Sequence, residues 1–187
     1  MLQPSFFPYP AIETERLVLR RVTEEDADDL FVLRSDERMM QYIDRPRAKS
    51  IEDAKKLIDV FEDFLQKGEG INWGISLKEN SRLLGTICLF KFQPENYRAE
   101  IGYLLHADFH RQGIMNEAMK PVIDYGFNTL KLHSIEANVN PSNLASIKIL
   151  EKNNFIREAY FRENYFYNGK FMDSAIYSLV KSKRKVF

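Results

Sequence analysis

The chain has 187 residues, 44% of them hydrophobic and 29% charged, which suits one domain with a substantial core and excludes a disordered chain. Its 27 lysines and arginines balance its 27 aspartates and glutamates, so charge gives no reason to expect a nucleic acid or an anionic membrane as a partner. A lone cysteine, no run near the ~18 apolar residues of a membrane span and no signal-peptide pattern at the start together predict a cytoplasmic protein.

The first part of the chain predicts one strand followed by two helices. Three prolines in the first ten residues favour an irregular arm over 1–11. Polar and apolar residues alternate over 16–20, as in a strand. Thr23 and Ser50 are residue types that favour helix N-caps, and the second helix is expected to end at Gly68.

The middle and the end of the chain predict strands separated by two further helices. Three strands joined by short polar turns indicate an antiparallel meander; they are expected over 72–77, 83–92 and 98–105. A helix kinked by Pro121 is expected after Gly113, then a strand over 133–140 and a helix after Asn143. A hairpin whose turn is Asn168-Gly169 follows, and the basic tail 181–187 is expected to be solvated.

These elements predict the fold class. Their order is strand, two helices, three strands, helix, strand, helix and hairpin. This order predicts an α+β fold with a central, mostly antiparallel, twisted sheet of six to seven strands and about four flanking helices. We found no linker or internal repeat, so we expect a single domain over 1–187.

The most informative segment is 100–118, where a strand runs into a short loop that opens directly into a helix. The first N–H groups of a helix have no partner within it, and the helix dipole is positive there. Gly113 allows the backbone to approach a ligand closely, and Arg111 adds positive charge. Such a junction suits a phosphate or pyrophosphate, although a glycine before a helix, taken alone, is more typical of a plain connecting turn.

This segment resembles the acetyl-coenzyme A motif of the Gcn5-related N-acetyltransferase (GNAT) superfamily. The stretch 110–115 matches its pyrophosphate loop, with Gly113 at the central glycine, but His110 replaces a glutamine or arginine and Met115 replaces a small residue. The segments 14–20, 99–103 and 143–155 are similar to the branch that acetylates the N-termini of ribosomal proteins. Asn154 stands where that branch usually has glycine.

The resemblance implies which residues bind acetyl-coenzyme A, the co-substrate. The backbone of three strand residues is expected to pair with the pantetheine arm; they are Tyr103, Leu104 and Leu105. Backbone amides of the loop and helix start are expected to hold the pyrophosphate; they belong to Arg111, Gln112, Gly113, Ile114, Met115 and Asn116. Asn143 matches a residue that bonds the cofactor arm, and a local role at the helix start is the alternative.

The resemblance also implies the catalytic residues. Glu100 is the candidate base that deprotonates the amine, directly or through water; the alternative is a sheet carboxylate paired with Arg98 or another cation. The tyrosine that many members use as acid is replaced here by Leu150. Ser146 is therefore assigned to the departing thiolate, with a packing or capping role as the alternative.

Aromatic residues are candidates for the acceptor side of the site. Tyr165 and Tyr167 lie on the final hairpin, where relatives line that side, although strand aromatics often serve packing. Trp73 is expected to line the acceptor cleft or to pack in the core. No metal site is expected from His106 and His110, since no cysteine or carboxylate completes a set. Cys88 lies in an apolar run and is expected to be a buried, inert thiol.

The sequence thus predicts an acetyl-coenzyme A-dependent N-acetyltransferase whose acceptor is a primary amine, the N-terminal amine of a protein or peptide first of all. Two alternatives remain open. One keeps the chemistry but uses a polyamine, an aminoglycoside-like amine or an amino acid, and the other is a coenzyme A-binding module without catalysis. No nucleic acid or membrane partner is expected, and a homodimer is an expectation from the resemblance alone.

Overall fold

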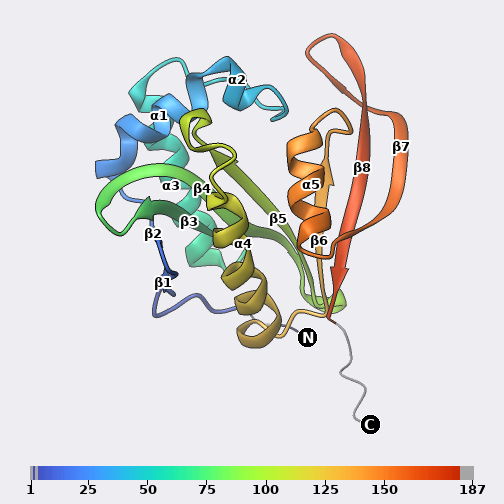
Figure 1. The fold of residues 1–187 in the computed structure, drawn as a ribbon, viewed down its shortest axis with the longest axis horizontal. Coiled ribbons are helices and arrows are strands. Elements are labelled where there is room, and N and C mark those ends of the chain that lie inside the picture. Colours follow the sequence, from blue (N-terminus) through green and yellow to red (C-terminus); the bar gives the residue numbers. More distant parts are fainter. Residues whose placement is uncertain (1, 3, 182–187) are drawn as a thin grey trace.

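The computed structural model describes residue 2 and residues 4–181, and at its centre is one eight-stranded sheet (Figure 1). The spatial order is β1-β2-β3-β4-β5-β6-β8-β7. The strands are β1 (Ile12–Glu13), β2 (Leu17–Arg21), β3 (Gly70–Leu77), β4 (Asn80–Gln93), β5 (Arg98–Leu105), β6 (Ser134–Val139), β7 (Ile156–Tyr167) and β8 (Lys170–Val180). Among the strands of the described residues, only β5 and β6 pair in parallel. The predicted mixed fold with a mostly antiparallel sheet is confirmed.

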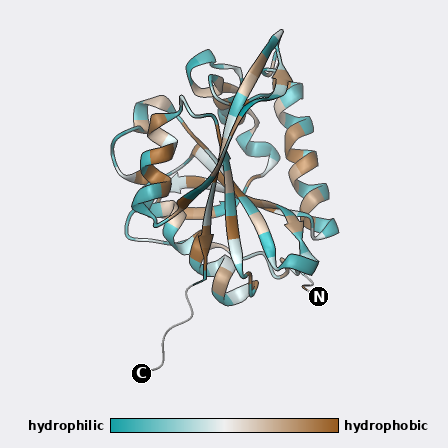
Figure 2. Cartoon of the chain, turned by 90° about the vertical axis from the view of Figure 1, so that its right-hand side faces the viewer, coloured by the Kyte–Doolittle hydropathy of each residue, from teal (hydrophilic) through white to brown (hydrophobic). Residues whose placement is uncertain are grey.

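Helices cover the sheet, and two hydrophobic clusters lie beneath them. The helices are α1 (Ala27–Ser35), α2 (Glu37–Met40), α3 (Ile51–Lys67), α4 (Ile114–Asp124) and α5 (Leu144–Lys152). One cluster joins α1, α2 and α3 to Leu83 and Leu104 of the sheet. The other joins α4 and α5 to the apolar residues of β2 to β6 and β8. In Figure 2 the helices carry both hydrophobic and hydrophilic segments, as expected for helices with one buried and one exposed side.

Two elements were not predicted, and both are very short. Strand β1 pairs Ile12 with Leu19 and adds an eighth strand beside the arm. Helix α2 begins at Asp36, whose carboxylate accepts hydrogen bonds from the backbone N–H groups of Arg38 and Met39. Neither element is long enough to show a hydrophobic period in the sequence.

In the N-terminal arm, residue 2 and residues 4–11 have no regular structure, as predicted, but the arm packs against the sheet. Phe6 is buried in the larger hydrophobic cluster. The Tyr9 hydroxyl donates a hydrogen bond to the backbone oxygen of Asn72 at 2.7 Å. The arm therefore contributes to the core of the molecule.

Local turn and cap chemistry agrees with the predictions. Ser50 caps α3, and the chain leaves that helix at Gly68 with φ +70°. The β7–β8 turn has positive φ at Asn168 and at Gly169, as a type I′ turn requires. Pro121 lies inside α4, and a π-helical turn, Tyr125–Thr129, follows that helix. Of the basic tail, residues 182–187 lie outside the described residues.

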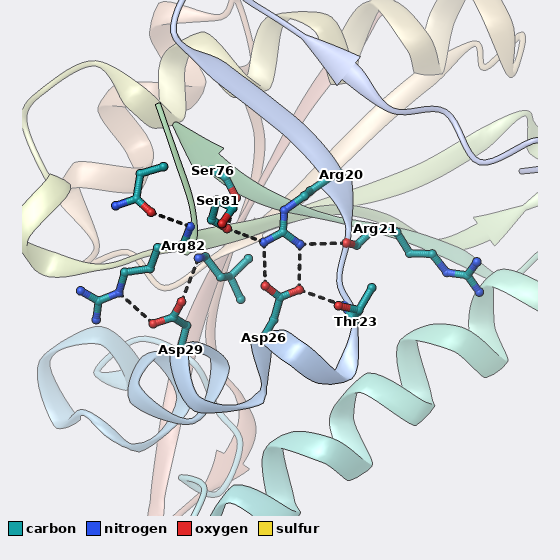
Figure 3. Close-up of polar contacts among 10 residues, drawn as sticks. Arg20, Arg21, Thr23, Asp26, Asp29, Ser76, Ser81 and Arg82 are labelled. Carbon is teal, nitrogen blue, oxygen red and sulfur yellow. Dashed lines mark hydrogen bonds and ion pairs between the residues drawn. The ribbon is translucent and has the colours of Figure 1, made fainter. Parts of the chain in front are cut away.

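An ion pair joins the first helical segment to the sheet (Figure 3). Both terminal nitrogens of Arg20, on β2, bind the two carboxylate oxygens of Asp26, at 2.8 and 2.6 Å. Asp26 also accepts a hydrogen bond from the backbone N–H of Thr23, and it is only 5% exposed. Nearby, Asp29 accepts hydrogen bonds from the Arg82 side chain and the Leu83 backbone. These contacts fix α1 against β2 and β4.

Candidate active site

The sheet opens between its two halves at β5 and β6. Their parallel pairing covers only three positions, from Arg98 opposite Ser134 to Glu100 opposite Glu136. Beyond Glu100, β5 continues to Leu105 and pairs with β4 on its other side, while β6 continues to Val139 and pairs with β8. Figure 1 shows the two strands close together near the bottom of the view and diverging toward the top. The far half of β5 therefore has an edge that β6 does not cover.

A cavity of about 430 Å³ occupies this opening. Residues of β5 from Glu100 to Leu104 form one wall, and residues 137–140, at the end of β6, form the opposite wall. The start of α5, residues of α1 and α3, the segment between these two helices, parts of β3 and β4, and the β7–β8 hairpin also line the cavity. The cavity thus contains the predicted residues Glu100, Tyr103, Leu104, Asn143, Ser146 and Tyr165.

The predicted pyrophosphate loop forms a strained turn just before α4. Gly113 has φ +79° and is the N-cap of the helix, and Arg111 also has positive φ, at +61°. The first N–H groups of α4, those of Ile114, Met115 and Asn116, have no partner within the helix. The Met115 side chain is 4% exposed and belongs to the larger hydrophobic cluster. It therefore points into the core, and this departure from the family motif does not fill the loop.

Contacts made by His110 and Glu117 hold this loop in place. A ring nitrogen of His110 lies 3.0 Å from the backbone oxygen of Leu105, which ties the loop to the end of β5. On α4, Glu117 accepts hydrogen bonds from the Thr14 hydroxyl and from the backbone and side chain of Arg16. Although burial favours its neutral form, these bonds hold the pKa of Glu117 below its usual value.

Glu100 lines the cavity at the point where β5 and β6 separate. Its carboxylate lies 2.7 Å from Lys91 Nζ, and its side chain is 13% exposed. Arg98, which the sequence suggested as a partner of Glu100, pairs with Glu136 instead. Burial raises the pKa of Glu100, and the ammonium of Lys91 only partly opposes this shift. Glu100 is therefore both an ion-pair partner and a carboxylate with a raised pKa in the cavity.

Two hydroxyl groups meet in the cavity between β5 and the start of α5. Tyr103, on β5, and Ser146, in the first turn of α5, place their oxygens 2.7 Å apart. Burial raises the pKa of Tyr103 to about 12. Asn143 caps α5 by accepting a hydrogen bond from the backbone N–H of Ser146 at 3.1 Å. Asn143 therefore has the local role at the helix start that was the alternative to binding the cofactor. The Tyr103 hydroxyl is a polar group of the cavity that was not predicted from the sequence.

Two residues considered for the acceptor side, Trp73 and Tyr167, do not line the cavity. Trp73 is 0% exposed, its indole N–H donates to the backbone oxygen of Pro10 at 2.7 Å, and it belongs to the core. It packs and does not line the cleft. Tyr165 does line the cavity, and its hydroxyl donates to the Asp44 carboxylate at 2.6 Å.

The sequence predicted a buried Cys88, but this residue of β4 lines the cavity and is only partly buried. Its thiol lies 3.4 Å from the backbone oxygen of Gly102. Burial raises the pKa of the thiol to about 11, so little thiolate is present at neutral pH. The raised pKa of the Cys88 thiol is consistent with the expectation that this thiol is unreactive.

Neither a metal cluster nor a membrane-spanning helix is found in the described part of the chain. Over residue 2 and residues 4–181, no three His, Cys, Asp or Glu side chains are grouped so that they could hold a metal ion. Within the same residues no helix is both long and apolar enough to cross a membrane.

Comparison with known proteins gives a consistent result. Residues 16–156 match a family model described as an acetyltransferase (GNAT) domain. The chain is 35% identical to the uncharacterized N-acetyltransferase YoaA of Bacillus subtilis (strain 168), over 94% of this chain and 99% of that protein. It is 26% identical to the ribosomal-protein-serine acetyltransferase of Escherichia coli (strain K12), over 89% and 94%. Its fold is similar to Mycobacterium smegmatis RimJ in complex with CoA-disulfide, with a TM-score of 0.85, 18% identity, and 95% and 90% coverage.

Proposed function

Because this chain belongs to the GNAT acetyltransferase family and is an N-acetyltransferase of that type, we propose that its acceptor is the α-amino group of a protein or peptide. The relative from Escherichia coli, named a ribosomal-protein-serine acetyltransferase, supports this acceptor. An α-amino group has a pKa of about 7.7–8, against about 10.4 for lysine, so far more of it is neutral at pH 7. A moderate base such as a glutamate is sufficient for such an amine.

The proposed reaction also needs a site for acetyl-coenzyme A. The observation that supports this site is the uncovered edge of β5 next to the loop before α4. In our proposal the pantetheine arm of acetyl-coenzyme A pairs with the backbone of Tyr103, Leu104 and Leu105 as an added strand. Its pyrophosphate binds the amides of the loop and helix start, from Arg111 to Asn116. The similar fold of Mycobacterium smegmatis RimJ, whose solved structure is a complex with CoA-disulfide, supports this arrangement.

The proposed reaction is a direct transfer while both substrates are bound. Glu100 accepts a proton from the amine, whose nitrogen then attacks the thioester carbonyl carbon. The C–N bond forms, the C–S bond breaks, and the thiolate of coenzyme A leaves. The thiolate, whose pKa is close to that of cysteine, about 8.5, takes up the proton that Glu100 releases through solvent, so Glu100 is regenerated. The Ser146 hydroxyl, which shares a hydrogen bond with Tyr103, donates a hydrogen bond to the departing sulfur. The protein mainly supplies positioning and charge stabilisation, because the thioester is already activated.

The test is an acceptor screen with acetyl-coenzyme A. Peptides that begin with serine or alanine, a polyamine, an aminoglycoside and free amino acids are each incubated with the enzyme. Thiol release is measured, and mass spectrometry locates the acetyl group. We expect acetylation of the peptide N-terminus. Exclusive acetylation of a polyamine or an aminoglycoside would overturn the proposed acceptor, and coenzyme A binding without thiol release from any amine would indicate a binding module.

A further inference from the structure

The acceptor side of the cavity contains a guanidinium that forms no side-chain hydrogen bond or ion pair among residue 2 and residues 4–181. Arg34, on α1, lines the cavity, and its Nε is buried without a hydrogen-bond partner among the described residues. The neighbouring titratable groups that affect it are Cys88 and a second cation, Arg45. Burial lowers the pKa of Arg34. A buried cation without an anion nearby is unfavourable, so an anionic ligand at this position would stabilise it.

The carboxylates that line the cavity are already occupied by other groups. Glu100 pairs with Lys91, and Asp44 accepts the hydrogen bond of Tyr165. Within residue 2 and residues 4–181, none of the ion pairs includes Arg34 or Arg45. The cavity therefore holds two guanidinium groups that form no ion pair with any acid among the described residues.

We propose that the acceptor carries a carboxylate close to its amine, and that Arg34 binds this carboxylate while Glu100 receives the proton of the amine. The inference rests on the proposed function, because it concerns the acceptor of that same reaction. A guanidinium is suited to a carboxylate, since its planar N–H groups can donate two parallel hydrogen bonds. Arg45, from the segment between α2 and α3, adds positive charge on the same side of the cavity.

This charge distribution argues against a polyamine as the acceptor. A polyamine would bring a second ammonium group into a cavity where two guanidinium groups form no ion pair with the part of the chain that the structure describes. The carboxylate has two chemical sources: an acidic side chain next to a peptide N-terminus, or the α-carboxylate of a free amino acid. Both present the same group to Arg34, so the experiment must separate them.

The experiment uses matched acceptors and matched variants of the full-length protein. The tripeptide amides Ser-Asp-Ala and Ser-Asn-Ala differ only in a side-chain carboxylate, and serine and serinamide differ only in the α-carboxylate. For each acceptor, kcat/KM is measured with acetyl-coenzyme A, and affinity is measured by calorimetry in the presence of coenzyme A. The proteins are the wild type, Arg34→Met, Arg34→Lys and the control Arg47→Met. Arg47 pairs with Glu37 at 3.4 Å on the exposed surface.

We expect at least one carboxylate acceptor to exceed its neutral partner by about tenfold or more in affinity and in kcat/KM. The pair that shows this difference identifies the source of the carboxylate. Arg34→Met should abolish the difference, Arg34→Lys should retain part of it, and Arg47→Met should leave it unchanged. Thermal unfolding should show that Arg34→Met is folded, because a methionine is easily accommodated at a mostly buried site.

Two results would overturn the inference. One is equal affinity and equal kcat/KM for charged and neutral acceptors in the wild type, and the other is a preference that persists in Arg34→Met. In both cases acetylation of neutral peptides would leave the proposed function intact. If no acceptor released thiol, the proposed function would fail, while the calorimetric comparison would still decide whether Arg34 binds a carboxylate.

Discussion

Glu100 experiences opposing influences on its pKa. Removal from water favours its neutral form, the ammonium of Lys91 favours its charged form, and the net result is a raised pKa. A carboxylate with a raised pKa is a stronger base, and it is still ionised at neutral pH unless the shift is very large. The ion pair with Lys91 is therefore compatible with proton transfer, and it holds the carboxylate in one position beside the cleft.

Replacing Glu100 with glutamine should remove the base and keep the shape of the side chain. We expect kcat to fall by about 100-fold, and the remaining rate to rise more steeply with pH as the acceptor amine loses its own proton. The measurement is kcat and kcat/KM against pH for a Ser-initiated peptide. An unchanged pH profile would exclude Glu100 as the base.

The melting temperature of Glu100→Gln shows whether a loss of activity comes from lost catalysis or from lost folding. Because the pKa of Glu100 is raised in the folded protein, its contribution to stability is greatest below pH 4.5, its usual pKa, and is lost as pH rises through the folded value. At neutral pH Glu100→Gln should therefore melt at the same temperature as the wild type or higher. A loss of activity accompanied by unfolding would contradict this account.

The Tyr103–Ser146 hydrogen bond predicts a coupled effect of two hydroxyl groups. Ser146→Ala and Tyr103→Phe should each lower kcat by about tenfold, with little change in KM for acetyl-coenzyme A. The double variant should be little slower than Ser146→Ala alone, because residues that act as a unit are not additive. Additive losses in this double-mutant cycle would show that the two hydroxyls act independently.

Single residues were predicted unevenly from the sequence. Glu100, Asn143 and Ser146 were identified through family motifs that stand in the local sequence. Lys91 and Arg34 were missed because only the tertiary fold brings them to the cavity. Lys91 lies at an irregularity of β4, with φ +49°, and Arg34 belongs to a helix with no motif of its own. The position of Trp73 depended on the arm that covers it, which no local pattern reveals.

At the scale of elements, the orientation of α4 depends on the turn before β2. Glu117 in its first turn binds Thr14 and Arg16, and the Arg16 side chain also donates to the Gln112 backbone oxygen at 3.1 Å. These bonds connect the start of the sheet to the loop that should bind pyrophosphate. The loop is therefore braced from a distant part of the chain.

Glu117→Gln should weaken this brace. We expect the free energy of unfolding to fall by about 1–2 kcal/mol and coenzyme A to bind several-fold more weakly. Because the pKa of Glu117 is lowered, the stability difference should be complete above its usual pKa of 4.5 and should disappear as pH falls below the folded value. Thermal unfolding at several pH values and calorimetry test this expectation. Glu13→Gln, at an exposed ion pair with Lys78, is the control and should change neither quantity appreciably.

Elements with strong local signals were predicted well. Helix α3 has a serine cap, a regular apolar stripe and a glycine at its end, and the β7–β8 hairpin has its Asn-Gly turn. The two missed elements, β1 and α2, exist because tertiary contacts or a single cap stabilise two and four residues. Their lengths give a periodic pattern no room to appear.

At the scale of the whole molecule, the functional feature is the separation of two halves of one sheet. Local patterns predicted every strand but β1, yet the parallel neighbours β5 and β6 are far apart in the chain. Their partial pairing depends on how the helices pack on each half. The family resemblance supplied the expectation of an open edge, and the three-position register of β5 and β6 provides the structural observation.

The attachment of the α1 layer to the sheet depends on the buried Arg20–Asp26 pair. Asp26→Asn should lower the free energy of unfolding by about 2–4 kcal/mol, because it leaves the guanidinium without its charged partner. The exposed pair of Asp63 and Lys67 provides the control, and Asp63→Asn should cost less than about 1 kcal/mol. Chemical denaturation measures both values. Equal effects would show that the Arg20–Asp26 pair is no more important than a surface pair.

The central claim is that the uncovered edge of β5 and the loop at Gly113 together bind coenzyme A. Calorimetric titration of the wild type with coenzyme A tests it most directly, with Gly113→Val as the variant, since a β-branched residue at φ +79° distorts the loop. The account predicts saturable, one-to-one binding by the wild type and much weaker binding by a folded Gly113→Val. Absence of binding by the wild type, or equal affinity in the two proteins, would contradict it.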